Sequence, residues 1–150
     1  METKRTALSY ALNLLTVRDR SEYEIRNKLS QKGYAKEEIE NTVLWLISKK
    51  FLNDKRLAQN QVRSLSGNIK RGKQKIIFGL KKRGISEETI TSLTKEINSE
   101  NEQKKAKDLA KKWLLKDQKK SNLYQRLGNH LFSHGYETET ITTVLEELLK

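Results

Sequence analysis

Apolar positions recur along the chain with the spacing of an α-helix. In the stretches Leu8–Leu15 and Ile39–Leu46, apolar residues fall three or four positions apart rather than at every second position. The sequence contains no proline, the strongest helix breaker, and most segments are rich in Leu, Lys, Glu, Ala and Gln, which favour helices. The pattern therefore predicts an all-α protein.

A long internal period organises these helices. Gly33, Gly84 and Gly135 follow one another at intervals of 51 residues. Aliphatic residues keep the same period in four columns around the glycines: Ile25, Ile76 and Leu127; Leu29, Leu80 and Leu131; Ile39, Ile90 and Ile141; and Leu46, Ile97 and Leu148. This regularity indicates three tandem copies of one structural unit.

Each unit is predicted to hold three helices. The aliphatic pair ahead of each glycine is typical of a helix that ends there, because glycine readily adopts the left-handed C-terminal conformation. The next helix begins at residues such as Ser86, while Ser21 and Glu24 have the spacing of a capping box. We expect helix-turn-helix-like repeats over residues 1–52, 53–99 and 100–150, stacked into an elongated, curved molecule. The polar stretch 98–107 is either a linker or the start of a helix in the third repeat.

Composition narrows the possible classes of function. The chain carries 31 Lys and Arg against 19 Asp and Glu, a net charge of +12, which favours an anionic partner. It contains no cysteine, which excludes disulfides, thiolate nucleophiles and Cys-ligated metals. The longest uninterrupted apolar run, Val43–Ile47, is far shorter than the roughly 20 residues that span a bilayer, so no membrane span is expected.

The motifs around the glycines form a longer string that runs through the first two repeats. The first repeat carries the string Ala7-Leu8, Leu14-Leu15, Arg18, Arg20-Ser21, Glu24-Ile25, Lys28-Leu29 and Lys32-Gly33-Tyr34. The second continues it with Phe51-Leu52-Asn53-Asp54, Leu57-Ala58, Val62-Arg63, Arg71-Gly72-Lys73, Ile76, Leu80, Lys82 and Gly84-Ile85-Ser86. Together these motifs resemble the RecX family of recombination regulators. The resemblance covers nearly the whole chain, and the third repeat matches mainly around Gly135. Leu57 stands where such proteins more often have Phe.

The resemblance implies a monomeric protein of the bacterial cytoplasm, without enzymatic activity or cofactor, that binds the RecA recombinase assembled on DNA. Similar proteins lodge in the helical groove of this filament and inhibit ATP hydrolysis, strand exchange and co-protease function. They thereby regulate recombination, DNA repair and the SOS response.

Basic residues supply the candidate contacts to the filament and its DNA. The stretch Lys70–Arg83 is dense in Lys and Arg and contains no acid. Charge and repeat position select eleven candidates: Arg18, Arg20, Arg26, Lys28, Lys32, Lys70, Arg71, Lys73, Lys81, Lys82 and Arg83. Lys32, Arg83 and His134 each precede a repeat glycine, which indicates either one basic edge along the stack or cations that offset negative helix ends.

The sequence lacks the residues that nucleotide binding, metal binding or catalysis would need. The segment Gly67–Gln74 satisfies G-x-x-x-x-G-K but lacks the following Ser or Thr and a preceding strand, so we expect a basic loop rather than a nucleotide site. His130 and His134 lie four residues apart without an adjacent Glu or a third ligand, so no metal site is expected. No catalytic residues can be nominated, and the protein is not expected to be an enzyme.

Aromatic side chains could stack on exposed bases, but we expect them in the core. The reason is that Tyr34 and Tyr136 share their repeat position with the aliphatic Ile85. The aromatic residues assigned to the core in this way are Tyr34, Trp45, Phe51, Trp113, Phe132 and Tyr136.

The alternative function is that of a direct DNA-binding protein, because a helix, a glycine turn and a second helix resemble a helix-turn-helix. The expected recognition helices, however, begin with acids that would face phosphate poorly, namely Glu37, Glu38, Glu40, Glu87, Glu88 and Glu139. We therefore expect weak, salt-sensitive binding to DNA and tighter binding to the filament.

Overall fold

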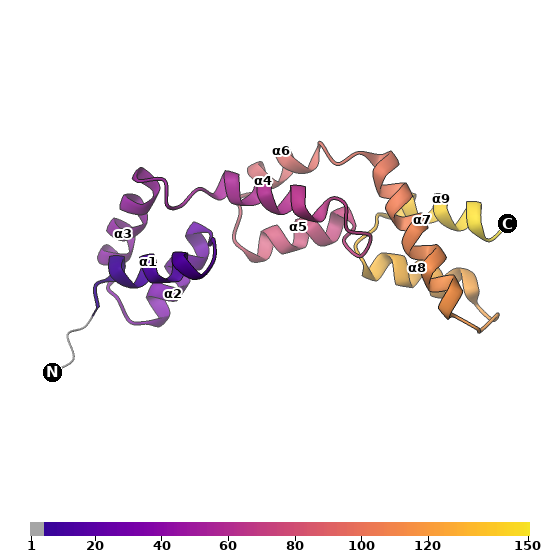
Figure 1. Ribbon diagram of the computed structural model, residues 1–150, viewed down its shortest axis with the longest axis horizontal. Helices are drawn as coiled ribbons and strands as arrows, with labels where there is room; N and C mark the ends of the chain where they lie inside the picture. Colours follow the sequence, from indigo (N-terminus) through magenta and orange to yellow (C-terminus); the bar gives the residue numbers. More distant parts are fainter. Residues whose placement is uncertain (1–4) are drawn as a thin grey trace.

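The computed structural model describes residues 5–150, and within this part of the chain the regular structure is entirely helical (Figure 1). The helices are α1 (Ala7–Val17), α2 (Glu22–Gln31), α3 (Lys36–Ser48), α4 (Asp54–Leu65), α5 (Lys73–Lys82), α6 (Glu87–Thr94), α7 (Ser99–Lys116), α8 (Leu123–Ser133) and α9 (Thr138–Leu148). The polar stretch 98–107 is therefore the start of α7 and not a linker. Among the described residues, no helix is both long and apolar enough to cross a membrane.

Polar side chains start several helices, as the sequence indicated for Ser21 and Ser86. Ser21 and Glu24 form the complete capping box at the start of α2. The side chains of Asn53 and Ser86 accept backbone N–H groups at the starts of α4 and α6. These caps satisfy amide groups that have no partner within the helix, and they fix where each helix begins.

The three repeat glycines end α2, α5 and α8 in the left-handed conformation. The φ angles of Gly33, Gly84 and Gly135 are +92°, +74° and +89°. At the first of these turns, the N–H of Tyr34 returns to the carbonyl oxygen of Leu29, closing the helix end. The chain can then reverse into α3, α6 or α9.

The nine described helices pack chiefly in three groups, α1–α3, α4–α6 and α7–α9, each with its own core. The predicted aliphatic pairs on the middle helix of each group are almost completely buried: Ile25 and Leu29, Ile76 and Leu80, and Leu127 and Leu131. Ile39, Ile90 and Ile141 cover them from the third helix of the group. A core of this size is small, so contact between the groups adds stability that no group has alone.

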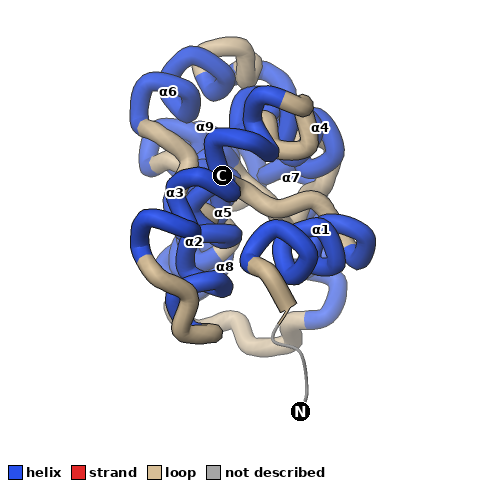
Figure 2. Tube along the Cα trace, turned by 90° about the vertical axis from the view of Figure 1, so that its left-hand side faces the viewer, coloured by secondary structure: helices blue, strands red, loops and turns tan. Residues whose placement is uncertain are grey.

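The groups follow one another along an elongated, bowed molecule, as predicted (Figure 1). The view along the long axis shows how narrow this arrangement is (Figure 2). The three middle helices α2, α5 and α8 lie toward the lower, concave edge in Figure 1. Elongation leaves a large part of every group facing solvent, which suits an extended partner.

The assignment of aromatic residues to the core is wrong for three of them. Phe132 is 68% exposed, Phe51 51% and Trp45 38%. Tyr136 is buried, and Tyr34 and Trp113 pack against the cores of the first and third groups. A small three-helix core offers too little interior to enclose every aromatic ring.

Candidate binding surface

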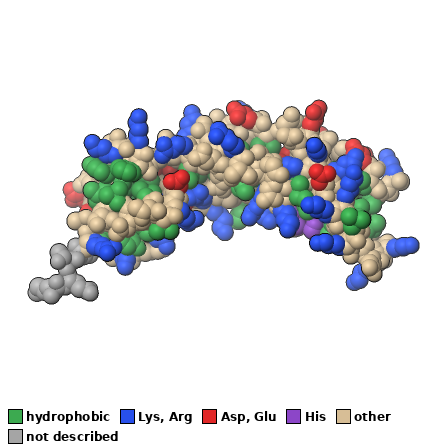
Figure 3. All heavy atoms as spheres, viewed as in Figure 1, with side chains coloured by type: hydrophobic (Ala, Val, Ile, Leu, Met, Phe, Trp, Pro, Cys, Tyr) green, Lys and Arg blue, Asp and Glu red, His purple; other side chains and the backbone are tan. Residues whose placement is uncertain are grey.

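The basic stretch Lys70–Arg83 covers the loop before α5 and α5 itself. Lys70, Arg71, Lys81 and Lys82 are exposed. Lys and Arg side chains gather along the lower edge of the molecule in Figure 3, where α5 and α8 lie. Like charges gathered on one side in this way create a positive potential that extends into solvent.

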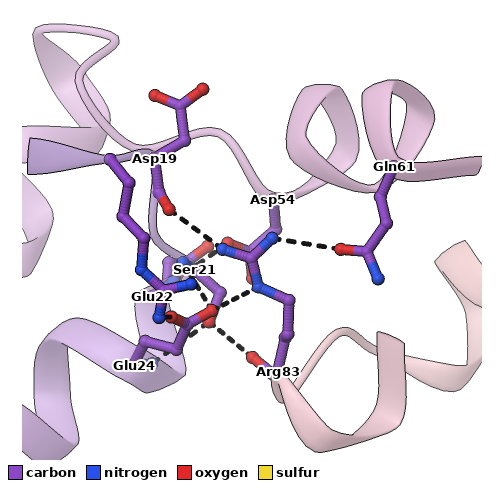
Figure 4. Close-up of polar contacts among 8 residues, drawn as sticks. Asp19, Ser21, Glu22, Glu24, Asp54, Gln61 and Arg83 are labelled. Atoms are coloured by element: carbon purple, nitrogen blue, oxygen red, sulfur yellow. Dashed lines mark hydrogen bonds and ion pairs between the residues drawn. The ribbon is translucent and has the colours of Figure 1, made fainter. Parts of the chain in front are cut away.

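Two candidates in the same stretch, Lys73 and Arg83, bind residues of a neighbouring helical group. The ammonium of Lys73 lies 3.7 Å from a carboxylate oxygen of Glu137, and its backbone N–H donates to Glu102. Arg83 is held more firmly, at the contact between the first and second groups (Figure 4). Its guanidinium donates to the Glu24 carboxylate at 2.5 Å and to the Gln61 side-chain oxygen at 3.0 Å.

Arg83 also reaches the backbone of the first group. One of its terminal nitrogens donates to the carbonyl oxygen of Asp19 at 2.9 Å, and its own carbonyl oxygen accepts from the Ser21 hydroxyl at 2.5 Å. The residue therefore joins α5 to α2, to α4 and to the segment before α2. Its charge is used inside the molecule, which a sequence pattern cannot reveal.

The contact between the second and third groups also joins the start of one middle helix to the end of the next. The N–H of Gly72, just before α5, donates to the carbonyl oxygen of His134, just after α8. In both contacts, the N-terminus of one middle helix meets the C-terminus of the next. Opposite ends of two helix dipoles are thereby brought together. The predicted column of Lys32, Arg83 and His134 thus contributes two of its members to contacts between groups.

A carboxylate completes each of these contacts. The N–H of Glu22 at the start of α2 donates to Asp54 at 2.9 Å, and the N–H of Lys73 at the start of α5 donates to Glu102 at 3.0 Å. Burial raises the pKa of Asp54 above its ordinary value, although the N–H bond from Glu22 opposes this. Acids therefore hold the groups together at both contacts.

Among the remaining candidates, three arginines differ in their surroundings. Arg26 pairs with Glu40 at 2.9 Å and with Glu22 at 3.5 Å, and the hydrogen bond to Glu40 raises its pKa. Arg18 is exposed and lies 3.4 Å from Glu24. Arg20 is partly buried. Arg18 and Arg26 are thus paired with acids, and of the three arginines Arg18 alone is exposed.

Six candidates remain exposed and form no ion pair within residues 5–150: Lys28, Lys32, Lys70, Arg71, Lys81 and Lys82. We call them the free cations. They belong to α2, α5 and the adjoining turns, in two of the three groups. One exposed ring lies near this set: Phe78, with the Lys82 ammonium 5.5 Å from its centre. Phe78 is not among the residues selected from the sequence, although its place on the polar face of α5 was a detectable signal.

Most of the G-x-x-x-x-G-K segment forms the loop between α4 and α5, as expected, and its Lys73 and Gln74 begin α5. Its second glycine is buried, and a Cβ there would lie 2.5 Å from the backbone of Gly135. Because the N–H of Gly72 is bound to His134, it is not available to hold a phosphate. This glycine permits close approach of two helical groups.

His130 on α8 and His134 just after it do lie side by side, with ring centres 4.5 Å apart. No cluster of three or more metal-ligating side chains occurs in the described part of the chain. The His130 ring also stacks on Trp113, at 5.7 Å between centres. Burial, together with the nearby His134, lowers the pKa of His130. The pair is thus packed as part of the third group.

Comparison with known proteins identifies the fold and the family. Residues 7–46 match the domain described as RecX, first three-helix domain, and residues 53–92 match RecX, second three-helix domain. The crystal structure of RecX from Lactobacillus salivarius superimposes with a TM-score of 0.81 at 24% identity, covering 95% of this chain and 94% of that one. The likeness confirms the fold across all three groups.

Curated relatives extend the similarity along nearly the whole chain. The regulatory protein RecX of Clostridioides difficile is 34% identical over 145 residues, which cover 95% of this chain and 68% of that protein. The regulatory protein RecX of Chlorobium limicola is 31% identical over 148 residues, covering 99% of this chain and 92% of that protein. The chain therefore belongs to the RecX family of regulatory proteins.

Proposed function

We propose that this protein binds the filament that RecA forms on DNA and inhibits its ATPase, strand-exchange and co-protease activities. It would act as a monomer without catalytic activity in the bacterial cytoplasm, regulating recombination and DNA repair. The observation that carries the proposal is the set of free cations on a bowed, elongated stack. An extended surface of this kind fits a polymer better than a small substrate.

Inhibition would be steric and conformational. A rigid stack that contacts neighbouring protomers hinders the movements that accompany ATP turnover and the addition of subunits. The contacts around Arg83 and Gly72 support this, because they tie the three groups into one continuous body. The free cations would supply attraction to the DNA phosphates, which weakens as salt rises.

Direct DNA binding is the second candidate, and the exposed ring of Phe78 beside the free cation Lys82 favours it. Against it stand the acids at the starts of α3, α6 and α9, where a helix-turn-helix protein would approach DNA. These helix starts would repel phosphate. DNA affinity alone is therefore expected to be weak.

The test measures ATP hydrolysis by RecA filaments assembled beforehand on single-stranded DNA as the protein is added. Binding of the protein to the same DNA without RecA is measured in the same buffer. Inhibition at concentrations too low to coat free DNA supports the proposal. An unchanged rate together with tight binding to bare DNA contradicts it and favours the second candidate.

A charge reversal with a matched control refines this test. Lys81→Glu with Lys82→Glu removes two free cations, and Lys111→Glu with Lys112→Glu makes the same charge change at exposed positions of α7. We expect the first pair to weaken inhibition at least about 10-fold and the second to have little effect. Equal effects of both pairs would mean that net charge alone governs binding.

A further inference from the structure

The outer face of α3 is apolar although it faces solvent. Leu44 is 60% exposed, and Trp45 and Phe51 are also exposed. The Trp45 and Phe51 rings stack almost parallel, with centres 6.0 Å apart and planes inclined at 12°. In Figure 3, apolar side chains gather at the end of the molecule where α3 lies, away from the basic lower edge. Large apolar residues gathered in this way are typical of a protein-binding surface.

The other two groups show that the fold does not need this apolar face. Lys95 and Glu96 occupy the positions of Leu44 and Trp45 in the second group, 51 residues later. In the third group, the equivalent positions are Glu146 and Glu147, which are exposed near the end of α9. Lys95 and Glu96 directly follow α6, which ends at Thr94, whereas Glu146 and Glu147 lie on α9. Because the second and third groups fold with polar residues at these positions, the apolar face of α3 is not explained by folding.

A groove of about 580 Å³ runs beside this face. Trp45 and Leu8 contribute apolar walls, and Glu37 and Glu38 provide the charged groups of its lining. No Lys or Arg of the described chain lines it, although the protein as a whole has a charge of +12. Glu38 accepts the N–H of Ala7, whereas Glu37 forms no ion pair among the described residues.

We infer that the α3 face and its groove bind an amphipathic, basic helix of a partner protein. This inference rests on the proposed function: the partner is the protein component of the filament and not its DNA. Apolar side chains of the helix would pack on Leu44 and Trp45, and a Lys or Arg at its end would meet Glu37. Short amphipathic helices bind apolar grooves in this way, while nucleic acid would be repelled by the same carboxylates.

The main test replaces the apolar pair by the residues of the second group. Leu44→Lys with Trp45→Glu leaves the net charge unchanged, and Leu115→Gln, at an exposed position on α7, is the control. Binding to RecA filaments on single-stranded DNA and to the same DNA alone is measured by fluorescence anisotropy with labelled protein. We expect the double variant to bind the filament at least about 10-fold more weakly, with unchanged binding to DNA alone.

A second test checks the charge of the partner. Glu37→Lys is compared with Glu88→Lys, which lies 51 residues later in the first turn of α6. Both changes alter the net charge and the helix dipole equally, so they affect folding and long-range attraction alike. We expect filament binding to weaken about 3-fold to 10-fold for Glu37→Lys only.

The outcomes separate the two proposals. If the unmodified protein does not bind the filament, both the proposed function and the proposed partner are wrong. If it binds and the α3 variants bind equally well, only the present inference is wrong. Equal loss of binding to bare DNA would assign the face to nucleic acid. A dimer seen by sedimentation that the double variant abolishes would assign it to a second copy of the chain.

Discussion

The Arg83 side chain lies at the centre of the first contact between helical groups, with its Nε 2.5 Å from an oxygen of Glu24. The two residues are 59 positions apart in the sequence and come from α2 and the end of α5. Only 22% of the Arg83 side chain and 15% of the Glu24 side chain are exposed. Removing one member of a charge pair so shielded from water leaves the other charge without its partner, which costs more than breaking a surface pair.

Removal of this pair is expected to destabilise the protein and loosen the first contact. Arg83→Ala leaves the Glu24 carboxylate, the Gln61 oxygen and the Asp19 carbonyl without this donor, which should cost about 1–3 kcal/mol. Urea unfolding measures the loss, and small-angle X-ray scattering measures any change in overall shape. Arg63→Ala, at an exposed position of α4, is the control. An unchanged stability and scattering curve would show that Arg83 does not hold the groups together.

Three glycine variants are expected to separate backbone strain from close packing. Gly33→Ala places a side chain at φ +92° in open space, and should cost about 1–2 kcal/mol. Gly72→Ala has an ordinary φ but meets the backbone of Gly135 at 2.5 Å. Gly84→Ala combines a positive φ with a clash against Tyr23, so we expect the largest loss of stability there. Chemical denaturation ranks the three, and a larger loss for Gly33→Ala than for Gly84→Ala would contradict the packing described.

Replacing one member of the buried ion pair of Glu102 and Lys105 should destabilise the protein more than replacing both members. The two charged groups lie 3.0 Å apart near the start of α7, and Lys105 also donates to the Arg71 carbonyl oxygen. Lys105→Met leaves a carboxylate buried without its cation, and should destabilise by about 3–5 kcal/mol. Adding Glu102→Gln should recover part of this loss, because the amide can still accept from the Lys73 N–H. Thermal unfolding measures both, and a double variant no more stable than Lys105→Met would contradict the pairing.

Stability is expected to rise with pH through the titration of His130. Because its pKa in the folded protein is below the ordinary 6.5, the unfolded chain binds the proton more readily. The contribution of the neutral ring is therefore full above 6.5 and is lost as the pH falls through the lowered value. Unfolding by urea at about pH 5 and at about pH 7 should show a smaller difference for His130→Gln than for the unmodified protein. Identical differences would mean that His130 does not contribute.

Local features of the fold were predictable because neighbours in the sequence determine them. The capping box of Ser21 and Glu24 and the left-handed turn at Gly84 depend on residues within a few positions of each other. The aliphatic columns predicted the buried pairs of α2, α5 and α8, because helical periodicity alone selects one face for burial. The family resemblance followed from the same motifs.

The tertiary structure decided which charges are free. From the sequence, Arg83 and Lys81 are both cations near the end of one helix, yet Arg83 is bound to the first group and Lys81 is exposed. The exposure of Trp45 was likewise not predictable, since its helical face lies outside a core too small to enclose it. Ion pairing and burial depend on which surfaces meet across dozens of residues, and the local pattern does not contain that information.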